Sequence, residues 1–279
     1  MELYLTKGLE MNINDVLLGD SVELMKQLPD KIIDLVVTSP PYDMARKYEG
    51  NVADSYTFEK FQEQAKELYR VMKKGGVIIW VVGDQTKNGS ESGTSFKQAL
   101  YFKEIGFKLY DTMIYRKNYY VPLTHRRYEQ AFEYMFVLTK GKPNTFNGIR
   151  EKCSYSGVKQ PTEWNAEASN DTGCRLRKRE GGYITKETKL RSNIWNYSPG
   201  KRLETDNIAN KHPAIFPYEL ARDHILSWSN EGDLVFDPMC GSGTTLIMAK
   251  QNKRNYLGMD IIDTYVDICK ERLERITND

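Results

Sequence analysis

The chain has 279 residues, of which 40% are hydrophobic and 28% are charged, and its formal net charge is +2. That length is enough for one large domain or two small ones, and Gly and Pro are too few for a fibrous or disordered chain. No apolar run is long enough to cross a membrane, and the first residues lack the apolar core of a secretory signal. Because the four cysteines show no Cys-x-x-Cys spacing, we expect no metal site, no disulfide framework and a cytoplasmic location.

Positive charge is concentrated in one part of the chain. Residues 140–202 contain fourteen Lys or Arg and six Asp or Glu, a balance of +8, so the remainder carries −6. Aromatic residues are interleaved with these charges, and no hydrophobic period is visible. Such a basic segment indicates a polyanionic partner, and a solvated lysine-rich loop is the alternative that charge alone leaves open.

The residues before this basic segment alternate between strand and helix patterns. Fully apolar, β-branched runs predict strands that are buried on both faces, and apolar residues at a period of 3.6 predict amphipathic helices. The expected elements are, in order, a short apolar run at 16–18, a helix at 21–28 with Ser21 as its N-cap, a strand at 32–37, a helix at 58–72 ended by Lys73–Gly76, a strand at 77–82, a helix at 95–105 and strands at 107–116 and 133–139.

After the basic segment the alternation returns. We expect a helix at 218–228, a strand at 234–236, a helix that starts at Thr244, a strand at 255–259 and a terminal helix at 264–276. Strands that alternate with helices predict an α/β fold, a doubly wound and mostly parallel sheet whose ligands lie at the carboxyl ends of its strands.

A glycine-rich turn follows one of these strands in the sequence Phe-Asp-Pro-Met-Cys-Gly-Ser-Gly-Thr-Thr, residues 236–245. Glycine lets the backbone approach a ligand closely, and the next helix offers free N–H groups to an anion. Asp260 ends the following strand, where a carboxylate can accept hydrogen bonds from ribose hydroxyls. The spacing fits neither a dinucleotide fingerprint nor a P-loop. The pattern predicts a nucleoside-containing cofactor, and a tight turn with a surface Asp is the alternative.

A proline-rich motif, Thr38-Ser-Pro-Pro-Tyr42, follows another expected strand. Two prolines cannot continue a central strand, so the motif is a rigid loop at the strand end. That loop aims the carbonyl of Pro40 and presents the side chains of Ser39 and Tyr42. Taken alone, the motif is better explained as a connector.

Together the two motifs resemble those of the S-adenosylmethionine-dependent DNA amino-methyltransferases, over nearly the whole chain. The proline motif precedes the basic segment and the glycine motif follows it, an order that resembles the β class of that family. Residues 212–217 and 193–195 also resemble elements of this class. The resemblance implies a Rossmann-like methyltransferase fold with an irregular basic insert, divided into a catalytic half at 1–139, a target-recognition region at 140–202 and a cofactor-binding half at 203–279.

The resemblance also implies roles for individual residues. The side chain of Ser39 and the carbonyl of Pro40 accept hydrogen bonds from the target amino group, and Tyr42 stacks on a base flipped out of the duplex. The implied catalytic set is Ser39, Pro40, Pro41 and Tyr42. The implied S-adenosylmethionine site consists of Asp20, Thr38, His212, Pro213, Phe216, Asp237, Pro238, Cys240, Gly241, Ser242, Gly243, Thr244 and Asp260. In that site Cys240 is expected to pack rather than to react.

The expected partner is double-stranded DNA, with a cognate restriction endonuclease and a second copy of the chain as further partners and no membrane. The basic residues expected to contact DNA are Arg126, Arg127, Arg175, Arg177, Lys178, Arg179 and Arg191. Serine at position 39, rather than Asp or Asn, resembles the N4-cytosine subset of this family, which implies N4 of cytosine as the methylated atom; N6 of adenine, whose enzymes more often have Asp at this position, is the alternative. More distant alternatives are a methyltransferase that acts on RNA or on protein glutamine, and a regulatory protein that binds the cofactor without catalysis. His125 and His224 are expected to be structural or surface residues.

Overall fold

The structure is a computed structural model that describes residues 3–6, 9–41, 56–120, 126–160, 183–199 and 215–276. Within these ranges, eight strands form the main sheet in the order β14-β8-β9-β5-β4-β15-β16-β3. β9 is antiparallel to both of its neighbours, and the other strands run in one direction. The predicted doubly wound, mostly parallel sheet is therefore confirmed. The strands are β3 (Asp15–Leu18), β4 (Ile33–Thr38), β5 (Met72–Val82), β8 (Lys108–Lys117), β9 (Phe132–Thr139), β14 (Ile194–Tyr197), β15 (Leu234–Asp237) and β16 (Asn255–Asp260).

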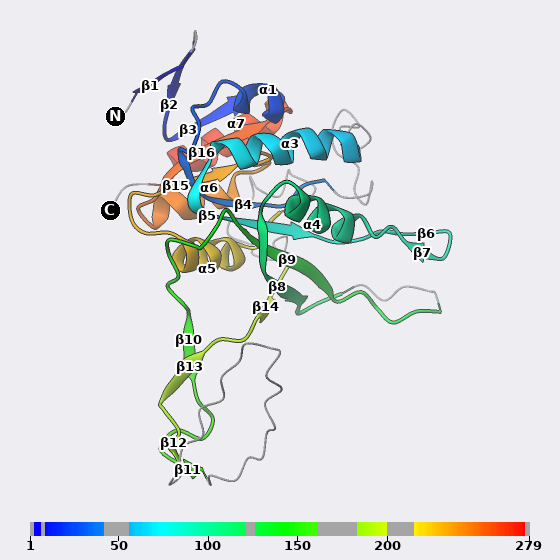
Figure 1. The fold of residues 1–279 in the computed structure, drawn as a ribbon, viewed down its shortest axis with the longest axis vertical. Helices are drawn as coiled ribbons and strands as arrows, with labels where there is room; N and C mark the ends of the chain where they lie inside the picture. The colour runs from blue at the N-terminus through cyan, green and yellow to red at the C-terminus, as the bar shows by residue number, and fades with distance from the viewer. Residues whose placement is uncertain are drawn as a thin grey trace. The chain divides into compact units, whose positions relative to one another are not determined.

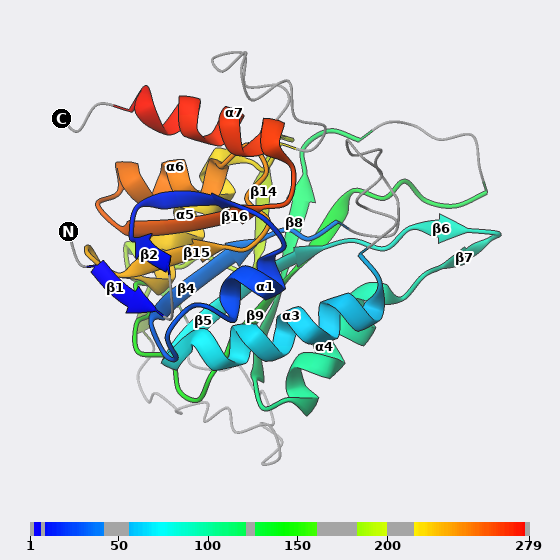
Figure 2. The same ribbon diagram turned by 90° about the horizontal axis from the view of Figure 1, so that it is seen from above.

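Helices cover both faces of this sheet (Figures 1 and 2). One layer contains α1 (Ser21–Met25), α3 (Phe58–Val71) and α4 (Thr94–Glu104). The opposite layer contains α5 (Tyr218–Trp228), α6 (Thr244–Gln251) and α7 (Asp263–Glu274). None of the described helices is long and apolar enough to cross a membrane.

The core lies between β5 and the layer of α3 and α4. Phe61, Trp80 and Phe102 are fully buried there, with ring centroids 5.2 to 5.7 Å apart and tilted or edge-on geometry. The indole N–H of Trp80 donates to Gln98 Oε1 at 2.8 Å, so this large side chain is buried with its donor satisfied. Dense aromatic packing fixes β5, and through its pairing with β4 it fixes the strand that carries the proline motif.

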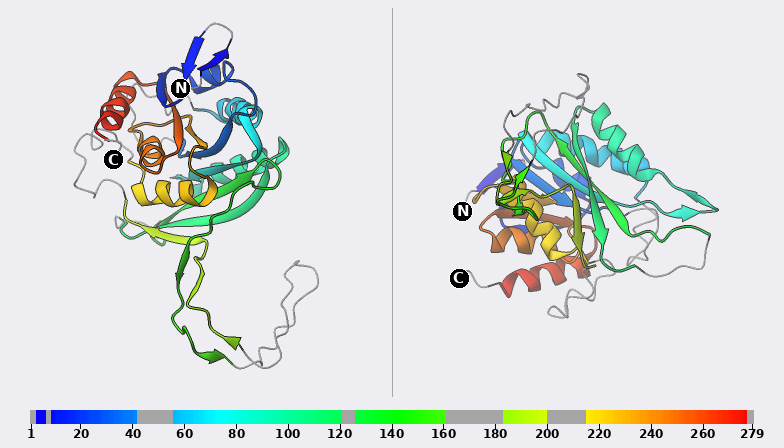
Figure 3. Two further views of the ribbon diagram at one scale, coloured as in Figure 1. Left: turned by 90° about the vertical axis from the view of Figure 1, so that its left-hand side faces the viewer. Right: turned by 90° about the horizontal axis from the view of Figure 1, so that it is seen from below.

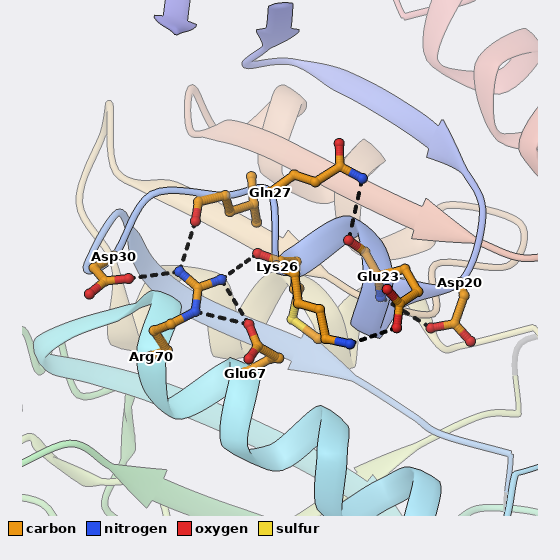
Figure 4. Close-up of polar contacts among 9 residues, drawn as sticks. Asp20, Glu23, Lys26, Gln27, Asp30, Glu67 and Arg70 are labelled. Carbon is orange, nitrogen blue, oxygen red and sulfur yellow. Dashed lines mark hydrogen bonds and ion pairs between the residues drawn. The ribbon is translucent and has the colours of Figure 1, made fainter. Parts of the chain in front are cut away.

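α1 begins at Ser21 as predicted, but its N-cap and its end differ from the prediction. Asp20, not Ser21, is its N-cap, because the Asp20 carboxylate accepts the N–H groups of Val22 and Glu23 at 2.9 and 3.3 Å. The helix ends at Met25 rather than at residue 28. The guanidinium of Arg70 on α3 binds the carbonyls of Met25 and Leu28 together with the carboxylates of Glu67 and Asp30, and so holds this short helix in place (Figure 4).

The junction of α3 and β5 also differs from the prediction. Residues Lys73–Gly76 were expected to separate a helix from a strand, but β5 begins at Met72, directly after α3. Gly75 has a φ of +84°, its N–H donates to the carbonyl of Lys140 at 2.7 Å, and a Cβ there would meet Asn144 Oδ1 at 2.1 Å. The pairing of β4 with β5 shifts register between Ile33 and Leu35. Lys73, Lys74, Gly75 and Gly76 therefore form an irregular start to β5.

Residues Gly148–Ser192 form a compact unit of their own, and Met1–Asn147 with Asn193–Asp279 form the other. In the smaller unit β10 (Arg150–Lys152) pairs antiparallel with β13 (Thr188–Leu190), and β11 (Lys159–Gln160) pairs antiparallel with β12 (Tyr183–Ile184) (Figure 3). The predicted target-recognition region, 140–202, extends beyond this unit at both ends, since residues 140–147 and β14 belong to the larger unit. Two further short hairpins were not predicted, β1 (Leu3–Thr6) with β2 (Leu9–Asn12) and β6 (Thr86–Lys87) with β7 (Ser90–Glu91).

Candidate functional site

Four neighbouring strands bring the predicted site residues to one edge of the sheet. β4, β15, β16 and β3 are adjacent and parallel, so their carboxyl ends meet. Ser39 follows β4, Asp237 and Asp260 end β15 and β16, and Asp20 lies two residues beyond β3. The N–H of Gly19 donates to the carbonyl of Asp260 at 2.8 Å, which ties the last two of these ends together. Ligands of open α/β sheets bind at this edge.

A buried hydrogen bond joins the proline motif to the glycine motif. Thr38 Oγ1 donates to Asp237 Oδ1 at 2.7 Å, and the N–H of Met239 donates to the same oxygen at 3.1 Å. Burial raises the pKa of Asp237 from 3.8 to about 6, although these hydrogen bonds favour its charged form. Thr245 Oγ1 adds a second link, because it donates to the carbonyl of Val37 at 3.1 Å. Two motifs about 200 residues apart in the sequence are therefore one structural unit.

The glycine turn is held in a conformation that side chains resist. Gly241 and Gly243 have φ angles of +49° and +80°. The carboxylate of Asp260 fixes the turn, because one oxygen accepts the N–H of Gly241 at 2.8 Å and the other accepts that of Ile262 at 3.0 Å. A Cβ at Gly243 would lie 2.2 Å from Cys269 Sγ. The close packing under the turn leaves no room for any residue larger than glycine.

Cys240 lies in the same turn and is buried. A hydrogen bond with Cys269, together with burial, raises the pKa of the Cys240 thiol well above its usual value. A thiol that holds its proton is a poor nucleophile, which agrees with the expectation that Cys240 packs rather than reacts.

The first turn of α6 offers polar groups to a ligand. No side chain caps this helix, whose N-cap is Gly243. The hydroxyl of Thr244 is buried, and it has no hydrogen-bond partner within the described part of the chain. An unpartnered hydroxyl is costly unless a ligand satisfies it, and N–H groups at a helix start attract anions. These groups fit the carboxylate of an amino-acid-containing cofactor.

The structure describes four further residues of the predicted cofactor site. Asp20 caps α1 (Figure 4). Its second carboxylate oxygen lies 2.9 Å from Lys60 Nζ. Phe216 is half-buried just before α5. Ser242 is buried, and its carbonyl accepts a hydrogen bond from Arg272, a contact that the sequence analysis missed. Pro238 lies within the turn between β15 and α6.

The residues predicted to act on the base are described in part. Ser39 and Pro41 are half-buried, and Pro40 is buried. Several predicted residues lie outside the described ranges, namely Tyr42, His125, His212, Pro213, Arg175, Arg177, Lys178 and Arg179.

Three of the predicted DNA-binding residues are described. Arg126 is exposed, whereas Arg127 donates a hydrogen bond to the carbonyl of Gly89. Arg191 is half-buried in the unit of residues 148–192, where its N–H donates to the carbonyl of Ile149 at 2.9 Å. His224 is fully buried with its Nε2 3.3 Å from Met135 Sδ, which agrees with the structural role expected for it.

Comparison with known proteins gives a consistent result. Residues 33–271 match the family described as DNA methylase. The orphan methyltransferase M.BamHII of Bacillus amyloliquefaciens is 50% identical over 254 residues, which cover 90% of this chain and 92% of that protein. The type II methyltransferase M.HpaI of Haemophilus parainfluenzae is 28% identical over 92% of this chain and 73% of its own length.

Solved structures are similar over the same range. A putative DNA modification methylase from Thermus thermophilus, complexed with S-adenosyl-L-methionine, is 26% identical with a TM-score of 0.60, and the match covers 94% of this chain and 95% of that one. The PvuII cytosine-N4-specific DNA methyltransferase is 21% identical with a TM-score of 0.68, over 95% of this chain and 86% of that one. The latter likeness supports the fold.

Proposed function

Because the chain belongs to the DNA methylase family, we propose that it transfers a methyl group from S-adenosylmethionine to the exocyclic amino nitrogen of a base in double-stranded DNA. The observation that carries this proposal is the buried hydrogen bond from Thr38 to Asp237. It fixes Ser39, the residue proposed to hold the target amino group, beside the glycine turn proposed to hold the methyl donor.

Ser39 and Pro40 hold the target nitrogen in a reactive state. The lone pair of an exocyclic amino group is delocalised into the ring of the base, so the nitrogen is a poor nucleophile. The Ser39 hydroxyl oxygen and the Pro40 carbonyl oxygen each accept one of its hydrogens, which favours a pyramidal nitrogen with a localised lone pair. Catalysis by this site is mainly positioning, because these acceptors need only fix the direction of attack.

The glycine turn and the strand ends around it hold the methyl donor. S-adenosylmethionine supplies an electrophilic methyl group on its sulfonium. The Thr244 hydroxyl and the N–H groups of the first turn of α6 bind its carboxylate, and Asp260 binds its ribose. Glycine at position 243 lets the backbone pass beneath the donor.

The unit of residues 148–192 binds DNA in this proposal. Among its described residues, cations outnumber anions. The cations include Arg150, Lys152, Lys186, Lys189 and Arg191, and the anions are Glu151 and Glu187. Contacts from such residues to phosphates give affinity that falls steeply with salt concentration. A target amino group paired inside a duplex is out of reach, so the base must be flipped out, and Tyr42 is proposed to stack on it.

We propose N4 of cytosine as the methylated atom, because serine occupies position 39. N6 of adenine is the second candidate, since the chemistry requires only an acceptor at this position and the sequence relatives described above are named without a base. A cognate restriction endonuclease and a homodimer stay predictions of the sequence.

Sequencing of DNA from cells that express the protein, with detection of modified bases, tests the proposal and identifies the base and its site together. Ser39→Ala should abolish the modification while calorimetry shows unchanged affinity for S-adenosylmethionine, because the lost acceptor acts in the transition state. Ser39→Asp retains an acceptor and should retain activity. Full activity of Ser39→Ala would refute the proposed site.

Replacement of residues 150–190 by a short Gly-Ser linker tests the DNA-binding unit. The variant should stay folded and bind the cofactor but lose site-specific methylation. If it methylates the same sites with the same dependence on salt, recognition lies elsewhere.

A further inference from the structure

Two segments project from the sheet beside the proposed active site. The β6–β7 hairpin follows β5, and the second segment consists of residues 118–120, which follow β8, and residues 126–131, which precede β9. β5 pairs parallel with β4, and β8 runs in the same direction, so both segments leave the same edge of the sheet as Ser39. In the strand order β8-β9-β5-β4, the hairpin follows the strand that neighbours β4, and the second segment joins the next two strands. We expect DNA that delivers a base to Ser39 to pass along this edge.

The hairpin and the second segment are fastened to each other. The guanidinium of Arg127 donates to the carbonyl of Gly89 in the hairpin turn and lies 4.0 Å from Glu91 Oε1. Nearer the sheet, Gln130 Nε2 donates to the carbonyl of Asp84 at 3.5 Å. Residues 84–92 and 126–131 thus form one projection, here named the arm, whose two parts run side by side in Figure 2.

The base of the arm is anchored firmly. The Asp84 carboxylate is buried, where it accepts the hydroxyl of Ser92 at 2.9 Å and the N–H of Ser95 at 3.0 Å. On the other segment, the N–H of Lys117 donates to the carbonyl of Ala131 at 2.7 Å. An arm held at its base by these contacts presents its tip in a defined place.

The exposed side chains of the arm suit a nucleic acid. Tyr128 is 102% exposed, so its whole ring lies in solvent. Arg126 and Lys87 are exposed on the same projection, while each of its anions, Asp84, Glu91 and Glu129, has an interaction partner. An exposed aromatic ring and an exposed guanidinium two residues apart in the sequence combine stacking on bases with attraction to phosphates.

We propose that the arm is a second DNA-binding element, in which Arg126 contacts a backbone phosphate and Tyr128 stacks on a base beside the flipped nucleotide. This inference rests on the proposed function, because it requires DNA at Ser39. Arg127 is then a positioning residue: it fastens the segment that carries Tyr128 to the hairpin and does not itself contact DNA.

The test compares variants on a duplex that contains the methylation site found by sequencing. Fluorescence anisotropy gives the Kd for DNA, and transfer of a labelled methyl group gives kcat and KM. Tyr128→Ala should weaken DNA binding by roughly 5- to 150-fold, the range for loss of one base–aromatic stack, whereas Tyr128→Phe should bind like the wild type. Arg126→Ala should flatten the log–log dependence of affinity on salt by about 0.9.

A mispaired target base tests where Tyr128 acts. Such a base is already easier to extrude, so Tyr128→Ala should lose less on the mispaired duplex than on the paired one. An equal loss on both duplexes would overturn the position of Tyr128 beside the flipped nucleotide. Arg127→Ala should weaken binding in the wild type but add little to Tyr128→Ala, and an additive effect would contradict its positioning role.

Arg275→Ala is the matched control. Arg275 follows α7, so it lies toward the opposite edge of the sheet from the arm. It should leave DNA affinity unchanged. Unchanged affinity and activity in Tyr128→Ala would overturn the inference, and a wild-type protein that methylates no DNA would instead refute the proposed function.

Discussion

Replacement of Gly243 by alanine tests the packing beneath the glycine turn. Two costs follow from the structure. The φ of +80° is a left-handed conformation, which costs an L-residue about 1–2 kcal/mol. The new Cβ would lie 2.2 Å from Cys269 Sγ, and overpacking of a buried site costs about 1–3 kcal/mol. The free energy of unfolding should therefore fall by about 2–5 kcal/mol, a large part of the stability of an ordinary domain.

Urea unfolding followed by tryptophan fluorescence measures this change, and two variants separate its causes. Gly232 has a φ of +85° and nothing within 4 Å of its missing Cβ, so Gly232→Ala should show the conformational cost alone. Cys269→Ala removes the sulfur, and the double variant with Gly243→Ala should be more stable than additivity predicts by about 1–3 kcal/mol. Equal losses for Gly243→Ala and Gly232→Ala, or strict additivity in the double variant, would refute the packing argument.

Three further predictions concern the site and its support. Because burial raises the pKa of Asp237 from 3.8 to about 6, the native chain keeps a proton that the unfolded chain loses. The free energy of unfolding should thus fall by about 3 kcal/mol as the pH rises from about 4 to about 6. Urea titrations of Asp237→Asn should lack that fall. If the free energy of unfolding of the wild type and of Asp237→Asn depended on pH in the same way, the assigned pKa would be contradicted. Thr244→Val removes a buried hydroxyl without a partner among the described residues. The cofactor-free protein should gain about 1 kcal/mol of stability, while calorimetry should show about fivefold weaker cofactor binding. Unchanged cofactor affinity would exclude Thr244 from the site. Arg70→Ala leaves the carbonyls of Met25 and Leu28 without their donor. Its free energy of unfolding in urea should be about 2 kcal/mol lower than that of the wild type, and that of Arg70→Lys should lie between the two. An unchanged free energy of unfolding in Arg70→Ala would mean that α1 needs no such anchor.

Strongly periodic elements could be predicted from the sequence because one physical signal dominates each of them. α5 spans Tyr218–Trp228 as expected, since its apolar residues recur at the helical period. The apolar run before the glycine turn likewise specifies β15. In contrast, the β6–β7 hairpin consists of exposed polar residues, and β14 buries only alternate side chains within a segment that otherwise lacks periodicity. Neither element carries a hydrophobic signal strong enough to predict it.

The candidate site was predictable in its parts but not in its connections. Individual residues such as Ser39 and Asp260 stood out because they lie at the ends of strand patterns. The contact between Thr38 and Asp237 depends on which strands lie side by side, and strand order follows from the packing of the whole sheet rather than from local pattern. Arg127 illustrates the same limit, since the sequence indicates its charge but not its contact with Gly89, which lies in a different part of the sequence.

The pairing of β10 with β13 has a consequence for how such proteins can diversify. Arg150 lies opposite Leu190 in an antiparallel pair. The chain therefore enters and leaves the unit of residues 148–192 at neighbouring points. Facing residues of antiparallel strands are only about 5 Å apart, so removal of everything beyond them leaves a gap that one or two residues can span. A unit attached in this way can be transplanted between relatives as a single stretch of sequence. On the proposal that this unit reads the DNA sequence, recombination would exchange recognition specificity while the sheet that carries the chemistry is inherited unchanged.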